Sequence, residues 1–125
     1  RKMFEPAYTL QAMANATEED HRRIQKAIDD MEAAIANAEQ TSHHDVSFHR
    51  AILHATHNPM TIRVGKTLLE LIEAALETSM QNLPKTALND HKAIYAAFQA
   101  GDVDMLKLAI EQSSKSWETD LTYRE

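Results

Sequence analysis

Asp45 and His49 are the residues of this sequence whose types and spacing most directly suggest chemistry. Residues four positions apart lie on the same face of an α-helix, and Phe48 and Ile52 direct that face toward a hydrophobic core. A buried carboxylate is costly unless it is paired or bound to a cation. A carboxylate and an imidazole one turn apart can share a divalent metal ion if other helices supply further ligands. From spacing alone, however, the favoured interpretation is an Asp45–His49 ion pair or a purely capping role for Asp45.

His91 is the next candidate ligand, because it shares its predicted helix face with Ile94, Tyr95 and Phe98. An imidazole from this second helix would complete a three-point site with Asp45 and His49. A fourth group could come from position 113, on the inward stripe of the last helix. That residue is Ser113, a poor transition-metal ligand but a good hydrogen-bond donor to an anion.

The remaining histidines are expected to be less specialised. Three of them lie among polar residues and are predicted to be solvated, and two flank the end of the third predicted helix, where they could interact with its dipole. The first group is His21, His43 and His44, and the second is His54 and His57.

Apolar residues recur at helical spacing along almost the whole chain, which predicts an all-α fold. Only 2 Gly and 3 Pro occur in 125 residues, whereas all-β folds need Gly- and Pro-rich turns. Short connections predict an antiparallel bundle of about six helices. The first predicted helix spans 3–16, the second follows the N-cap Thr17, and the third follows a capping box of Ser42 and Asp45. The fourth runs from Pro59, with Asn58 as its cap, to about Met80. The fifth runs from Thr86 to Gly101, which is expected to be left-handed, and the sixth follows the cap Asp102.

Composition and charge exclude several function classes. The chain has no cysteine and therefore neither a disulfide nor a thiolate zinc site. With 13 Lys+Arg against 19 Asp+Glu, its net charge is -6, so no direct DNA contact is expected from these residues. No apolar run of about 18 residues and no signal-peptide pattern occurs, so no membrane partner is expected.

An enzyme has to be weighed against a binding domain. Asp45, His49 and His91 could hold a zinc-bound water, so a metal-dependent hydrolase is the alternative function. The sequence has no HExxH motif, nucleophile elbow or phosphate-binding Gly loop, and no further carboxylate stands out as a general base. We therefore expect no catalytic residues. A third possibility, a purely structural helical module, predicts neither a cavity nor a metal.

Three segments of the chain resemble one family. They are RKMFEP at 1–6, DVSFHRAILHATHNPM at 45–60, and HKAI at 91–94 followed by AGD at 100–102. Together they are similar to the C-terminal effector-binding domain, the FCD domain, of GntR-type bacterial transcription regulators of the FadR subfamily. The resemblance covers nearly the whole chain. The segment 83–102 is particularly similar to the sugar-acid branch of that family.

This resemblance implies a helical bundle with a central polar cavity. In such domains one Asp and three His hold a divalent metal, often zinc or nickel, and a small carboxylate effector binds beside it. Asp45, His49 and His91 match three ligand positions, whereas the fourth position is Ser113, which puts the metal affinity in doubt. Arg1 matches an inward-pointing arginine that pairs with effector carboxylates, and Ser113 is the hydroxyl partner that we expect for a polyol acid.

The resemblance also implies a domain organisation. Residues 1–125 are expected to form the effector-binding domain of a cytoplasmic regulator whose N-terminal winged helix-turn-helix is absent from this chain. DNA would be contacted only through that absent domain. A homodimer is expected, because the fourth helix and the last helix, with Leu106 and Trp117, offer apolar surface beyond one small core.

Overall fold

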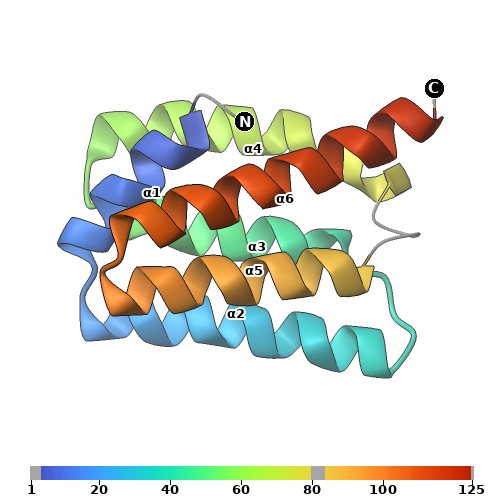
Figure 1. The fold of residues 1–125 in the computed structure, drawn as a ribbon, viewed down its shortest axis with the longest axis horizontal. Helices are drawn as coiled ribbons and strands as arrows, with labels where there is room; N and C mark the ends of the chain where they lie inside the picture. The colour runs from blue at the N-terminus through green and yellow to red at the C-terminus, as the bar shows by residue number, and fades with distance from the viewer. Residues whose placement is uncertain (1–3, 80–83, 125) are drawn as a thin grey trace.

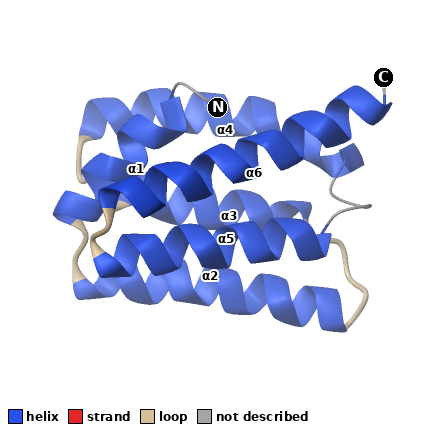
Figure 2. Cartoon of the chain, viewed as in Figure 1, coloured by secondary structure: helices blue, strands red, loops and turns tan. Residues whose placement is uncertain are grey.

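The computed structural model describes the backbone of residues 4–79 and 84–124 and the side chains of residues 4–74 and 84–115. Within these ranges the chain consists of α-helices and connecting loops, without a strand (Figure 2). The predicted all-α fold is therefore confirmed. The helices are α1 (Phe4–Asn15), α2 (Glu18–Ala36), α3 (Ser42–His54), α4 (Pro59–Ser79), α5 (Pro84–Ala100) and α6 (Val103–Arg124).

The bundle is built around α3. The pairs α2–α3, α3–α4 and α5–α6 run antiparallel side by side, whereas α5 packs against α2 and α3 rather than against α4 (Figure 1). α3 packs against α1, α2, α4 and α5, and α6 packs mainly against α5. The side chains that α3 directs inward are therefore enclosed from several sides. The inward stripes predicted for α2, α3, α5 and α6 form the core, which includes Ile24, Met31, Phe48, Ile52, Ile94, Leu106 and Ile110.

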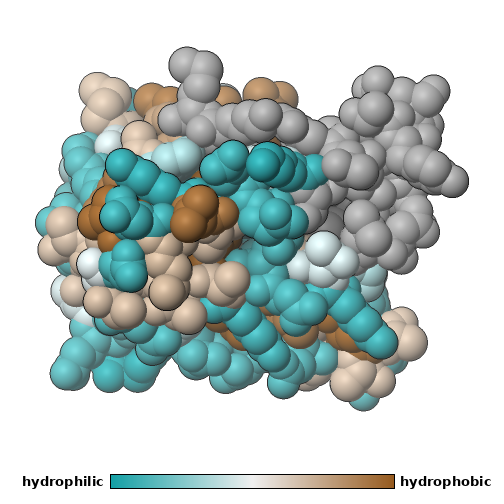
Figure 3. All heavy atoms as spheres, in the orientation of Figure 1, coloured by the Kyte–Doolittle hydropathy of each residue, from teal (hydrophilic) through white to brown (hydrophobic). Residues whose placement is uncertain are grey.

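Hydrophilic residues cover most of the described surface in Figure 3, and strongly hydrophobic residues form separate spots. Leu106 is completely buried, so it belongs to the core rather than to an outer apolar surface. The side chain of Trp117 lies outside the described residues, so its predicted contribution is not assessed. None of the described helices is long and apolar enough to cross a membrane. The large exposed hydrophobic residues are Met60, Val64 and Leu71 on α4 and Val103, Met105 and Leu108 on α6.

The predicted helix caps are confirmed at several positions. The Thr17 hydroxyl accepts a hydrogen bond from the Asp20 backbone N–H at 3.2 Å, and the Asp20 carboxylate accepts one from the Thr17 backbone N–H at 2.8 Å. These two bonds form the capping box of α2. Asn58 caps α4 ahead of Pro59, since its side-chain oxygen accepts a bond from the Met60 N–H at 3.1 Å. The Asp102 carboxylate caps α6 in the same way, and Gly101 has the predicted positive φ of 67°.

Two predicted helix starts are wrong. Ser42 is the first residue of α3 rather than its cap, and the preceding Thr41 makes no side-chain capping bond. Asp45 therefore takes no part in a capping box, and its carboxylate turns into the bundle instead. α5 begins at Pro84 rather than at Thr86, because a proline in the first turn of a helix loses no hydrogen bond. The predicted helix ends at Met3 and Met80 lie outside the described residues.

A buried carboxylate joins the turn after α3 to the start of α2. Asp20 is 2% exposed, and its Oδ2 lies 2.6 Å from Nε2 of His57. His57 adopts a positive φ of 52°, which is uncommon outside glycine. Beside this pair, the Asn15 side-chain amide donates to the Thr56 carbonyl at 2.8 Å. His57 thus binds a neighbouring helix start, rather than acting on the end of its own helix as predicted.

The Asp20 carboxylate gives the fold a pH-dependent contribution. Burial alone would raise the pKa of Asp20, but hydrogen bonds from the Thr17 backbone, from His57 and from the Thr17 side chain outweigh burial and lower it. A carboxyl whose pKa is lower in the folded than in the unfolded chain stabilises the fold above the unfolded value, about 3.9 for Asp. This stabilisation is lost as the pH falls through the folded value.

We predict that Asp20→Ala lowers the free energy of unfolding at pH 7 by about 1–3 kcal/mol, because a cap and a buried partner are both lost. Urea denaturation should show the difference from wild type shrinking as the pH falls below about 4. Glu39→Gln is the control, since it removes one negative charge from an exposed loop. A loss for Asp20→Ala that stays constant down to pH 2 would contradict the role of ionised Asp20.

Candidate metal centre

Asp45, His49 and His91 converge inside the bundle as the sequence analysis predicted. α3 supplies the first two residues, one turn apart, and α5 supplies the third from its buried face. Their exposed fractions are 3%, 3% and 1%, respectively. One potential ligand atom of each residue lies within 4.8 Å of those of the other two. Nε2 of His49 is 3.5 Å from Oδ1 of Asp45, and Nε2 of His91 contacts the same oxygen directly.

The environment of Asp45 favours its ionised form. Complete burial would by itself raise the pKa of this carboxyl. The charge of His91 and the hydrogen bonds from His49 and His91 outweigh burial, so the pKa of Asp45 lies well below its ordinary value. A full negative charge is thus held at the centre of the bundle, and the imidazoles around it are the groups that compensate it.

Phe48 fixes the orientation of the two imidazoles. Its ring stacks on that of His91, with centroids 4.1 Å apart and planes inclined by 10°. The same ring meets His49 edge-on at 5.2 Å, and the two imidazoles are nearly perpendicular to each other, at 89°. Phe48 is itself completely buried and is part of the core. The core side chain of Phe48 therefore packs against both histidines and restricts the directions of their nitrogen lone pairs.

The donor set fits a divalent transition metal. Two imidazoles and one carboxylate are ligands that zinc and nickel accept. Ligand atoms about 2.0–2.2 Å from one tetrahedral ion lie about 3.3–3.6 Å apart. The 3.5 Å between Nε2 of His49 and Oδ1 of Asp45 agrees with this spacing, whereas Nε2 of His91 contacts that oxygen more closely than two ligands of one ion do and would have to move apart from it to admit the ion. Three protein ligands leave a coordination position open for water or another small molecule, as catalytic and sensing sites require.

Glu5 is a residue of this region that the sequence analysis did not single out. It lies in the first turn of α1, is 3% exposed, and places Oε1 3.4 Å from Nδ1 of His49. A signal for it was present in the sequence, because Glu5, Tyr8 and Ala12 share one helical face, and Tyr8 and Ala12 are apolar. A charged residue on that apolar face predicts a buried carboxylate. The sequence of α1 alone does not indicate that its partner is His49 on α3.

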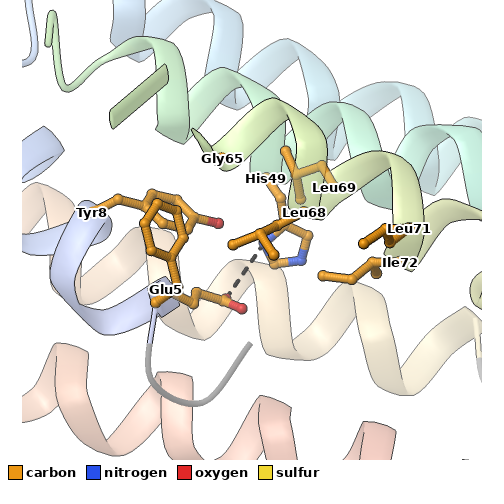
Figure 4. Close-up of a pocket in the computed structure, with 9 residues that line it drawn as sticks. Glu5, Tyr8, His49, Gly65, Leu68, Leu69, Leu71 and Ile72 are labelled. Atoms are coloured by element: carbon orange, nitrogen blue, oxygen red, sulfur yellow. Dashed lines mark ion pairs between the residues drawn. The ribbon is translucent and has the colours of Figure 1, made fainter. Parts of the chain in front are cut away.

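A cavity of about 120 Å³ lies next to His49, between α1 and α4 (Figure 4). Glu5, His49 and the Tyr8 hydroxyl are the titratable groups among its lining residues. Beside the cavity, α4 packs closely on α3 because Gly65 lacks a side chain: a β-carbon at this position would lie 2.4 Å from Cδ1 of Leu53. The sequence analysis predicted a central polar cavity. Among the described residues, the cavity next to His49 has a largely apolar wall instead. That wall consists of Phe4, Tyr8, Gly65, Leu68, Leu69, Leu71 and Ile72.

The other predicted effector residues have different outcomes. Ser113 is 5% exposed on α6, on the inward side as predicted. Arg1 lies outside the described residues, so its predicted role is not assessed.

The histidines that were expected to be solvated differ among themselves. His43 is exposed, whereas His44 is half-buried. His54, which was predicted to flank the end of its helix, is the last residue of α3 and is also half-buried. His21 is also half-buried, and its Nδ1 lies 3.1 Å from the Tyr95 hydroxyl, so the prediction of a purely solvated side chain is wrong for it. It packs against the aromatic rings of α5 rather than facing solvent alone.

An all-α bundle with this buried Asp/His/His cluster is compatible with the family that the sequence resembles, and comparison with known proteins establishes the relationship. The profile of the FCD domain matches residues 1–113. The chain belongs to the FCD domain family. The predicted resemblance to the effector-binding domain of GntR-type regulators is confirmed.

Two curated proteins are similar to this chain. One is the galactonate operon transcriptional repressor of Escherichia coli (strain K12), which is 30% identical over 113 residues, covering 87% of this chain and 49% of that protein. The other is the HTH-type transcriptional repressor NanR of Klebsiella aerogenes, which is 29% identical over 120 residues, covering 93% and 46%. The chain thus spans about half the length of these relatives. Their names agree with a regulatory rather than an enzymatic domain, and nothing in the comparisons favours the hydrolase alternative.

We predict that Phe48→Leu frees the His91 ring while leaving an apolar side chain in the core. Loss of the stacked pair should cost about 0.5–1.5 kcal/mol beyond the change in buried area. In NMR spectra, the ring protons of His91 should lose the ring-current shift that Phe48 imposes on them. Phe98→Leu is the matched control, because Phe98 is also buried but packs against His21. Unchanged His91 ring resonances in Phe48→Leu would contradict the orienting role.

Proposed function

We propose that this chain is the ligand-sensing domain of a transcription regulator and that it binds a small carboxylate next to a divalent metal ion. The observation that carries the proposal is the buried convergence of Asp45, His49 and His91 in a chain of the FCD family. Stability alone does not explain such a cluster, because apolar side chains of similar volume often stabilise a fold as well or better. Metal binding would account for its presence at the centre of the bundle.

Asp45, His49 and His91 would hold the ion, with zinc or nickel as the metals that suit this donor set. The bound ion supplies positive charge and an open coordination position for an oxygen ligand. Phe48 keeps the two imidazoles oriented, and burial excludes water from the ligand atoms. Ser113 stands where the family places a fourth ligand, so we expect weaker metal binding than a four-ligand site would give.

The effector in this proposal is a sugar acid or hydroxy acid. The name of the galactonate operon repressor, to which the chain is similar, supports this class. Arg1 would pair with the carboxylate through its planar guanidinium, and Ser113 would donate a hydrogen bond to the ligand. The negative charge of Glu5 beside His49 disfavours an anion on that side. The carboxylate is therefore expected to approach the ion from the side away from Glu5.

DNA binding in this proposal belongs to an N-terminal winged helix-turn-helix domain outside residues 1–125, since the relatives are about twice as long as the aligned region. Effector binding changes operator affinity only if the ligand prefers one arrangement of the bundle, and typical couplings are about 1–3 kcal/mol. We also propose a homodimer. The exposed apolar stripe of Met60, Val64 and Leu71 on α4 supports this part of the proposal.

The metal is tested by titrating the chelator-treated protein with Zn²⁺ and Ni²⁺ in a calorimeter. We predict one ion per chain for wild type and a loss of affinity of at least about tenfold when Asp45, His49 or His91 is replaced by alanine. His43→Ala is the matched control, because it removes an exposed imidazole of α3 outside the cluster. Equal affinity of all four variants would refute the site.

The effector is tested by thermal denaturation with a panel of sugar acids and hydroxy acids, with and without the metal. A true effector at a hundredfold excess over its Kd should stabilise the fold by about 2.7 kcal/mol. This stabilisation should decrease in Ser113→Ala and on removal of the metal. Stabilisation by none of the acids would contradict the carboxylate class, whereas product formation from a stabilising acid would favour the hydrolase.

A further inference from the structure

His49 lies between two buried carboxylates, one at each ring nitrogen. Nδ1 is 3.4 Å from Oε1 of Glu5, and Nε2 is 3.5 Å from Oδ1 of Asp45. The three side chains come from α1 and α3 and are between 3% and 5% exposed. Figure 4 shows the Glu5 side chain reaching across from α1 to the His49 ring. The imidazole therefore presents a different nitrogen to each carboxylate.

We infer that Glu5 is a positioning residue that holds His49 ready to bind the metal, an inference that rests on the proposed metal site. A neutral imidazole carries one N–H and one lone pair, and the group that accepts the N–H decides which nitrogen is free for a metal. When the metal is bound, Glu5 accepts the Nδ1 proton, and Nε2 gives up the hydrogen bond that it otherwise donates to Asp45. The lone pair of Nε2 then points toward Asp45 and His91, the direction in which the ion binds.

Glu5 acts through His49 rather than as a further ligand. Among the described residues, Asp45, His49 and His91 form a group whose potential ligand atoms lie within 4.8 Å of one another. Glu5 is not part of this group. The Glu5 carboxylate faces the opposite nitrogen of the ring. In metal sites, a carboxylate in this position fixes the tautomer and ring orientation of the histidine and raises its basicity.

The charges of the cluster support the same role. With Glu5 and Asp45 both ionised, the interior would carry two negative charges, and a divalent ion beside neutral imidazoles would bring two positive charges. The buried site is therefore electrically balanced when the metal is bound, which reduces the cost of burying both carboxylates. This contribution matters more in a chain where Ser113 replaces a fourth ligand, because each remaining ligand must bind more strongly.

The test is a double-mutant cycle on metal affinity. Zn²⁺ affinity is measured by competition with a chelator for wild type, Glu5→Gln, His49→Ala and the double variant. We expect Glu5→Gln to weaken Zn²⁺ binding by about 10- to 100-fold in the wild-type background. In the His49→Ala background the same substitution should have no further effect. Glu39→Gln, which removes an exposed negative charge, should leave the affinity unchanged.

Each outcome decides the inference. A Glu5→Gln affinity within twofold of wild type would overturn it, and so would an equal loss in both backgrounds, because Glu5 would then not act through His49. A wild-type protein that binds no divalent ion would overturn the proposed metal site as well. Nitrogen NMR of the Zn²⁺-loaded wild type needs no variant. It should show His49 bound to the ion through Nε2 with the proton on Nδ1, and binding through Nδ1 would overturn the inference.

Discussion

The ionised carboxylate of Asp45 at the centre of the bundle is the constraint on which the rest of this structure depends. A buried charge is tolerated only when other groups compensate it, and here His91 and His49 do so from two helices. This requirement fixes the register of α5 against α3, because His91 has to meet an oxygen carried by α3. The surrounding hydrophobic core, in which Phe48 packs against both imidazoles, therefore also supports this polar centre.

Much of this arrangement could be predicted from local periodicity. Asp45 and His49 are one turn apart beside Phe48 and Ile52, so their shared inward face follows from helix geometry alone. His91 could be placed on the inward face of its own helix for the same reason. Spacing alone favoured a simple Asp45–His49 ion pair. The resemblance to the FCD family added the prediction that His91 belongs to the same site.

The rest depends on how helices align with each other, which a periodic pattern does not specify. The Asp20–His57 pair joins residues 37 positions apart, and Glu5 meets His49 across two helices. The start of α3 shows a different limit, because Thr41 and Ser42 are both good capping residues and only the backbone distinguishes them. The left-handed backbone of His57 could not be predicted either, since glycine is the usual signal for that conformation.

Side chains in α3 and just after its end bind residues of neighbouring helices. Asp45 lies in the first turn of α3 and His49 at its middle, and just beyond its end is His57, bound to the first turn of α2. The polar centre and the joint between α1 and α2 are therefore anchored to the same helix, and the position of α3 enters the geometry of both.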